Sequence, residues 1–131
     1  MKFNVCFSKI HRATVTDANL DYVGSVTIDE DILDAAGLLP NQIVQINNTA
    51  NGYPWRTYIL KGERGKGDII LNGPPAHHFK RGDVVIIWAE TWVTPQEAAK
   101  MTGPRVTFVD GNNKVTEVKK EEYWPPEAYV K

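Results

Sequence analysis

The longest apolar run in the chain is VVIIWA, at residues 84–89. The run is far shorter than the roughly 20 apolar residues that a helix needs to cross a bilayer. Four of its residues are Val or Ile, whose branched side chains favour strands. We therefore expect residues 84–89 to form a strand that is buried in the core.

Similar short segments lie on both sides of this run. They are rich in Val, Ile, Thr and aromatic residues and are separated by clusters of Gly, Asn, Asp and Pro, a pattern typical of a mainly β fold. Asn51-Gly52 predicts a type I′ hairpin turn, because both residues tolerate positive φ, and Asp110-Gly111 predicts another turn. The expected strands are residues 3–7, 13–17, 25–28, 43–47, 55–60, 68–71, 84–89 and 106–109.

Two short helices are expected between the strands. The first has Asp29 as its N-cap and ends at Gly37. The second begins after Thr94, with Glu97 completing a capping box, and stops at Gly103-Pro104. Many short strands with few helices favour a closed barrel, because closure removes exposed strand edges.

Composition limits the class of protein. With 131 residues, of which 42% are hydrophobic, the chain suits one compact domain. Fifteen Lys and Arg oppose sixteen Asp and Glu, so we expect no partner among nucleic acids or membranes. Cys6 is the only cysteine, and the N-terminal residues lack the apolar stretch of a signal peptide. We expect a cytoplasmic protein.

Common site motifs are absent from the sequence. The glycine-rich stretch at residues 62–67 lacks the Lys-Ser/Thr end of a phosphate loop. His77 and His78 are adjacent, so on a strand they would point to opposite faces, and we expect no metal site. If Lys9 and His11 lie on a strand, they share one face.

Eight short blocks of the chain are informative in combination. They are Lys9-Ile10-His11-Arg12, Tyr22-Val23-Gly24-Ser25, Leu33-Asp34-Ala35-Ala36-Gly37, Asn51-Gly52, Thr57-Tyr58, Glu63-Arg64-Gly65, Asn72-Gly73 and Gly82-Asp83-Val84-Val85-Ile86-Ile87. In order and spacing they resemble the aspartate 1-decarboxylase family, from about Met1 to Thr107.

The resemblance implies a fold, an activity and an assembly. The fold would be a mainly β, double-psi β-barrel with two or three short helices, and the assembly a homotetramer. The activity would be pyruvoyl-dependent decarboxylation of L-aspartate to β-alanine and carbon dioxide, on the route to pantothenate and coenzyme A. The single domain, residues 1–131, would cut itself between Gly24 and Ser25 into a β chain, 1–24, and an α chain, 25–131.

The resemblance also implies roles for individual residues. Ser25 would attack the Gly24 carbonyl and become the pyruvoyl group, which then forms a Schiff base with the substrate amine. Gly24 lacks a Cβ and so permits unusual backbone angles. Thr57 would stabilise the charge on the Gly24 oxygen, and Tyr58 would protonate the product carbanion. The implied substrate-binding positions are Lys9, Thr57, Asn72 and the Gly73 backbone, and the supporting residues are His11 and Tyr22.

The chain departs from the family at one substrate-binding position. The family has an arginine that clamps a substrate carboxylate two residues after the Asn-Gly pair, and Pro54 stands there in this chain. Arg56 lies two residues further on, which keeps the face of the strand and shifts the origin by roughly 6.6 Å. We expect Arg56 to replace the clamp. This departure concerns the substrate and leaves open another small amino acid such as L-glutamate. Independently of it, the sequence leaves open an uncleaved barrel that binds a small acid or a partner protein, and a helper protein in maturation.

Overall fold

The structure is a computed structural model that describes residues 1–120, apart from the side chain of Pro75. The strands are β1 (Phe3–Thr14), β2 (Asp17–Asn19), β3 (Ser25–Asp29), β4 (Ile43–Asn48), β5 (Pro54–Gly62), β6 (Ile69–Asn72), β7 (Val84–Val93), β8 (Arg105–Val109) and β9 (Val115–Lys120). The helices are α1 (Glu30–Ala36), the 3-10 helix η1 (Pro74–His78) and α2 (Pro95–Ala99). None of the described helices is long and apolar enough to cross a membrane.

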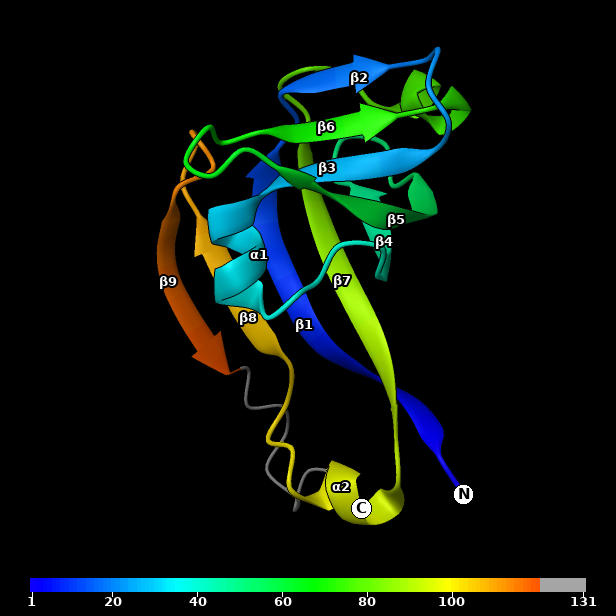
Figure 1. Cartoon of the computed structure of the whole chain (residues 1–131), viewed down its shortest axis with the longest axis vertical. Helices are drawn as coiled ribbons and strands as arrows, with labels where there is room; N and C mark the ends of the chain where they lie inside the picture. The colour runs from blue at the N-terminus through cyan, green and yellow to red at the C-terminus, as the bar shows by residue number, and fades with distance from the viewer. Residues whose placement is uncertain (121–131) are drawn as a thin grey trace.

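The strands form one sheet that closes into a barrel. Their order is β2-β6-β3-β5-β4-β7-β1-β8-β9. The sheet closes because β1, which pairs with β7, continues into β2, which pairs with β6. At this junction Val15 N donates to Asp83 O and Thr16 N donates to Ile69 O, both at 2.8 Å. This closed, mainly β architecture with short helices confirms the expected double-psi β-barrel (Figure 1).

The apolar run at residues 84–89 lies in β7, as expected, but only alternate side chains are buried. Val85, Ile87 and Ala89 face the barrel interior, whereas Ile86 and Trp88 are half-buried on the outer face. The reason is that β7 pairs antiparallel with β1 and β4, so one face of the strand points inward and the other outward.

The first two expected strands differ from the observed ones. Instead of strands at 3–7 and 13–17, β1 runs without a break over Phe3–Thr14. Its register with β7 shifts between Cys6 and Ser8 and between Ile10 and Ala13, and Arg12 has a φ of 60°. These irregularities bend the strand without ending it. Beyond the barrel, β1 and β7 continue as a ribbon toward α2 (Figure 1).

Both predicted helix starts are confirmed. The Asp29 side chain accepts from Asp31 N, and Gly37 ends α1 with a φ of 70°. Thr94 and Glu97 form the expected capping box of α2. This helix ends at Ala99, earlier than the Gly103-Pro104 stop that the sequence suggested.

The hairpin between β4 and β5 has a longer loop than predicted. Only Gly52 has positive φ, 72°, and Asn51 does not, so the type I′ prediction was wrong. Asn48 N donates to Tyr53 O at 3.1 Å and Gly52 N to Asn48 O at 2.7 Å, which closes a loop over residues 49–52. The turn expected at Asp110-Gly111 is confirmed, since Asn113 N donates to Asp110 O at 2.9 Å.

Candidate functional site

Three polar residues lie abreast on neighbouring strands at one end of the barrel. Asn19 of β2 pairs with Asn72 of β6, which pairs in turn with Ser25 of β3. Asn72 Nδ2 donates to Ser25 Oγ at 3.0 Å and to Thr27 Oγ1 at 3.3 Å. Ser25 is 2% exposed, so its hydroxyl is shielded from bulk water and accepts a hydrogen bond from a buried amide.

The segment before Ser25, residues 20–24, is called the cleavage loop below. Tyr22 and Val23 are 63% and 84% exposed in it. Gly24 ends the loop without a positive φ, and a Cβ placed on it would meet only Trp55 Cζ2 at 3.7 Å and Asn72 O at 3.9 Å. These are ordinary contact distances, so the approach to Gly24 is open, as expected, and its φ does not itself require glycine.

A cavity of about 490 Å³ opens beside Gly24. Its lining includes Arg56, Thr57 and Tyr58 of β5, and also Ile43 and Trp55. Thr57 is buried and Tyr58 is half-buried. Because Val26 of β3 pairs in parallel with Ile59, the start of β3 at Ser25 lies beside the part of β5 that carries Tyr58. The structure therefore brings the predicted self-processing and proton-donor positions together.

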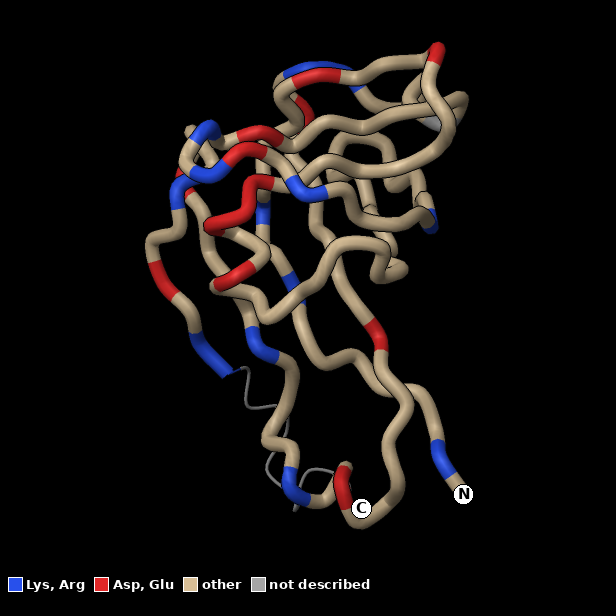
Figure 2. The backbone as a smooth tube through the Cα atoms, viewed as in Figure 1, with Lys and Arg blue, Asp and Glu red and all other residues tan. Residues whose placement is uncertain are grey.

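Arg56 lies at the edge of this cavity and already has a partner. Its Nη1 is 3.3 Å from Glu90 Oε2, and 61% of its side chain is exposed. Glu90 is the only charged residue of β7 (Figure 2). A hydrogen bond from Asn4 lowers the pKa of Glu90, burial raises it, and Arg56 lowers it further, so the net shift is downward. Glu90 is therefore ionised and draws the guanidinium along the outer face.

Pro54, Arg56 and Tyr58 alternate with buried residues on β5, and the β4–β5 register has no shift. No bulge at Pro54 moves the guanidinium toward the position that the family uses.

Lys9 and His11 line a different cavity, of about 360 Å³, with Phe108 and Lys119 among its other residues. They share a face of β1, as expected. Lys9 pairs with Trp88, Trp88 with Gln45 and Gln45 with Arg56, so Lys9 lies three strand spacings from Arg56, roughly 14 Å along the sheet. Within one chain, the structure does not bring Lys9 or His11 to the cavity beside Gly24.

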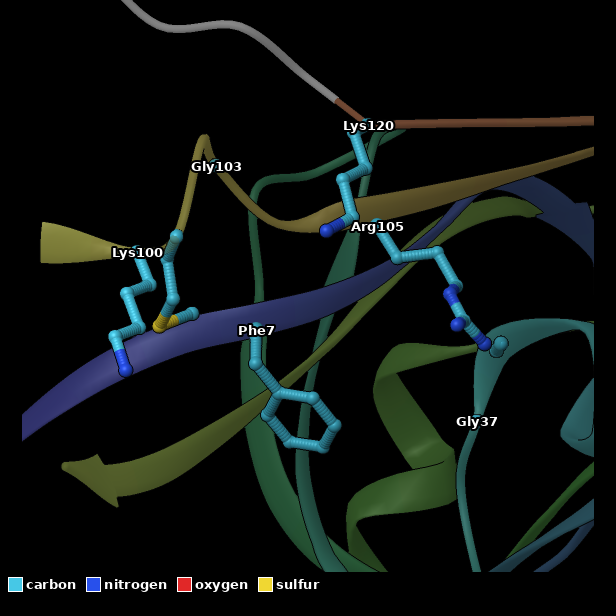
Figure 3. Close-up of a pocket in the computed structure, with 8 residues that line it drawn as sticks. Phe7, Gly37, Lys100, Gly103, Arg105 and Lys120 are labelled. Carbon is cyan, nitrogen blue, oxygen red and sulfur yellow. The ribbon is translucent and has the colours of Figure 1, made fainter. Parts of the chain in front are cut away.

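A further cavity, of about 280 Å³, lies near the end of α1 and holds none of the predicted site residues. Figure 3 shows Lys100, Arg105 and Lys120 around it, with the Arg105 guanidinium directed toward Gly37. Arg105 Nη1 donates to Ala35 O at 3.3 Å, so this arginine binds the C-terminal end of α1. This structural contact accounts for the position of Arg105 without a ligand in the cavity.

Four residues of the site were not expected from the sequence. They are Asn19, Thr27, Trp55 and Glu90. The alignment of Asn19 and Thr27 with Asn72 depends on long-range strand pairing, which no local pattern reveals. Trp55 lies two residues from Thr57, so the period of two could have placed it on the same face. Among the described residues, no group of three or more His, Cys, Asp or Glu could hold a metal ion.

Comparisons with known proteins show the family of the chain. Residues 1–116 match the family described as aspartate decarboxylase. The chain is 51% identical over 122 residues to the aspartate 1-decarboxylase of Caldicellulosiruptor saccharolyticus, covering 93% of this chain and 94% of that protein. It is 53% identical over 114 residues to the protein of the same name from Carboxydothermus hydrogenoformans, covering 87% and 89% of the two chains. The chain therefore belongs to the aspartate decarboxylase family.

Proposed function

We propose that this protein is an aspartate 1-decarboxylase, which converts L-aspartate to β-alanine and carbon dioxide for pantothenate and coenzyme A synthesis. It would first cut itself between Gly24 and Ser25. The observation that carries the proposal is the buried Ser25 hydroxyl, held 3.0 Å from Asn72 Nδ2 at the end of an exposed loop and beside a cavity. The names of the relatives support the substrate.

The first step of self-cleavage uses groups of the chain alone. Ser25 Oγ attacks the carbonyl carbon of Gly24, the C–N bond between the two residues breaks, and the hydroxyl proton goes to the departing nitrogen. An ester joins the fragments. The Asn72 amide stabilises charge on Oγ as the proton leaves, and the Thr57 hydroxyl is the proposed donor to the Gly24 oxygen.

Later steps release the fragment 1–24 and convert Ser25. Elimination removes the Cα proton of residue 25 and breaks the bond between Cβ and Oγ, leaving Gly24 as a carboxylate. The enamine that remains takes a proton at Cβ, and water then replaces the nitrogen of residue 25, which leaves as ammonia. A pyruvoyl group at the head of 25–131 results. The site fits so small a group, because Ser25 is 2% exposed and the neighbouring cavity is about 490 Å³. When present, a pyruvoyl group accepts the electrons that carbon dioxide leaves behind.

During turnover, the residues of the chain bind, orient and protonate. Tyr58 is half-buried in the cavity lining and would hold its phenol proton for transfer to the substrate carbon. Arg56 would bind a substrate carboxylate through its guanidinium. Asn72 and the Gly73 backbone would orient the bound substrate, with Tyr22 in support. His11, like Lys9, lines a different cavity and would act here from a second copy of the chain.

We also propose a cytoplasmic homotetramer. Two large apolar side chains, Trp92 at 64% and Ile43 at 48% exposed, line one surface cavity together. Exposed apolar surface of this kind is typical of protein interfaces. Cys6 is the only cysteine of the sequence, so the chain has no intrachain disulfide, which suits a reducing compartment.

The test is the variant Ser25→Ala, followed by intact mass and by carbon dioxide release from L-aspartate. We expect the wild type to give fragments 1–24 and 25–131, and the variant to stay whole and release no carbon dioxide. Ser8→Ala is the matched control, because Ser8 is also a fully buried serine but donates to Ala36 O at 2.7 Å in α1, away from the cavity.

Two results would contradict the proposal. A wild-type chain that stays whole and binds small acids would indicate an uncleaved binding barrel. Cleaved protein that releases carbon dioxide from L-glutamate, and not from L-aspartate, would indicate the other substrate.

A further inference from the structure

Gly73 packs against the cleavage loop, residues 20–24. A Cβ placed on Gly73 would lie 2.7 Å from Gly24 Cα, 3.0 Å from Gly24 N and 3.2 Å from Tyr22 O. Real Cβ atoms do not approach backbone atoms this closely, so one of the two segments would have to move. Gly73 also has a φ of 108°, which L side chains rarely adopt. The steric need for glycine therefore lies at Gly73, while Gly24 has room for a Cβ.

Every backbone group of Gly73 is engaged. Its N–H donates to Asn19 O at 2.7 Å, just before the loop begins, and its C=O accepts from Ala76 N at 2.9 Å in η1. Its Cα faces Gly24, where the loop ends. Gly73 thus contacts both ends of a loop whose middle residues are exposed, and it cannot move independently of η1.

The neighbouring residue contacts the other side of the bond to be cut. Asn72 Nδ2 donates to Ser25 Oγ at 3.0 Å, while Gly73 lies against Gly24. The electrophile and the nucleophile of self-cleavage are therefore positioned by two consecutive residues at the end of β6.

From this arrangement we propose that Gly73 is a positioning residue for self-cleavage, an inference that rests on the proposed function. Its backbone is the fixed surface against which the cleavage loop closes. The contact sets the position of the Gly24 carbonyl carbon relative to Ser25 Oγ before the bond between them forms. Any side chain at this position displaces the carbonyl from the hydroxyl.

The experiment times self-cleavage of Gly73→Ala by intact mass after cell-free synthesis of the full chain. We expect the fragment 1–24 to form about 100-fold more slowly than in the wild type, since a misplacement of about 1 Å can cost this much. Hydroxylamine at neutral pH splits esters much faster than Asn-Gly bonds such as Asn51-Gly52, and it should release 1–24 from little of the variant, because the ester forms too slowly to accumulate.

Gly82→Ala is the matched control for backbone strain. Gly82 has a φ of 93°, and a Cβ placed on it would meet nothing within 4 Å. Asn113→Ala calibrates the effect of lost stability, because Asn113 is buried and bonds Thr14 and Gly67, away from the cleavage loop. Together these variants and the wild type relate cleavage rate to melting temperature.

The inference requires Gly73→Ala to cleave far more slowly than its melting temperature predicts from these controls. A rate that agrees with them would overturn it. If Gly73→Ala does not fold, a second variant tests the inference: one glycine inserted between the exposed Tyr22 and Val23. The longer loop releases Gly24 from its contact with Gly73 and leaves every strand unchanged. Slow cleavage of the insertion variant would support the inference, and cleavage at the wild-type rate would overturn it.

Cleavage of the wild-type chain tests the proposed function separately from the inference about Gly73. A wild type that stays whole would overturn the proposed function together with this inference. A wild type that is cut, with Gly73→Ala cut equally fast, would overturn the inference alone.

Discussion

The side-chain amide of Asn72 donates hydrogen bonds to two hydroxyls. Its Nδ2 lies 3.0 Å from Ser25 Oγ and 3.3 Å from Thr27 Oγ1. The resemblance implied a role in substrate binding for Asn72. Its contact with Ser25 Oγ supports the proposed role in self-cleavage, because an oxygen that accepts a hydrogen bond is stabilised as negative charge develops on it. The same amide would thus contribute first to self-cleavage and later to substrate binding.

Arg56 gives the sharpest prediction about the substrate. We expect Arg56→Ala to raise the KM for L-aspartate by about 10- to 100-fold, because a hydrogen bond to a charged group contributes about 1.5–3 kcal/mol. Self-cleavage should continue, since Arg56 contacts neither Gly24 nor Ser25 by any hydrogen bond described for it. Steady-state kinetics on fully cleaved protein would measure the change.

The matched control for this variant is Lys61→Ala. Lys61 is an exposed cation on the same strand, and it pairs with Glu30 at 3.6 Å, outside the cavity lining. Its removal should leave KM unchanged. An unchanged KM in Arg56→Ala as well would mean that another group holds the carboxylate.

At the scale of elements, Asp29 joins α1 to the loop between β5 and β6. Its carboxylate accepts from Asp31 N at 2.8 Å, Gly65 N at 3.1 Å and Gly67 N at 2.6 Å. The residue is 1% exposed. Because β3 ends at Asp29, this junction also holds the strand that begins with Ser25.

We expect Asp29→Ala to lower the free energy of unfolding by about 2–4 kcal/mol, because it removes an N-cap and leaves buried amides without an acceptor. Asp34→Ala is the control: this carboxylate is 63% exposed and pairs with Arg64, so its loss should cost less than about 1 kcal/mol. Urea unfolding of both variants would measure the difference. Equal stabilities would contradict the role given to Asp29.

The same carboxylate makes stability depend on pH. Burial raises the pKa of Asp29, but the amides of Gly67, Asp31 and Gly65 outweigh it, so the pKa lies below the usual 3.8. The unfolded chain then binds this proton more readily than the folded one, so the stabilisation is present above about pH 3.9 and is lost as the pH falls through the folded pKa. Melting temperatures should fall below about pH 4, less steeply in Asp29→Asn.

At the scale of the whole molecule, the barrel separates Lys9 from Ser25. By way of β7 and β4, Lys9 is three strand spacings from Arg56, roughly 14 Å, and β3 lies one strand further on. By way of β2, ten residues separate Lys9 from Asn19, a path of at most roughly 33 Å if fully extended, and the strand bends between Ile10 and Ala13. If Lys9 binds the substrate, a second copy of the chain must supply it.

Complementation between two inactive chains tests this. Lys9→Ala retains Ser25, and Ser25→Ala retains Lys9. We expect co-expression of the two variants to yield more carbon dioxide release than the sum of the variants alone, because mixed assemblies contain some sites with both residues. Activity no greater than that sum would place Lys9 outside the shared site.

Local sequence was enough to establish the parts that depend on neighbouring residues. The caps of α1 and α2 at Asp29 and Thr94 were predicted from residues within one turn of each helix. The shared face of Lys9 and His11 followed from the period of a strand. The mainly β class followed from composition and spacing, whereas the barrel type and the site residues required likeness to a family.

Only the tertiary structure decided what depends on strand register. The row of Asn19, Asn72 and Ser25, and the contact of Gly73 with Gly24, join segments about 50 residues apart in the chain. The loop at Asn51 and the unbroken β1 also escaped local patterns, because pairing across strands overrode turn and strand preferences. Local patterns report the conformation of a segment, and the partner of that segment is set by packing of the whole barrel.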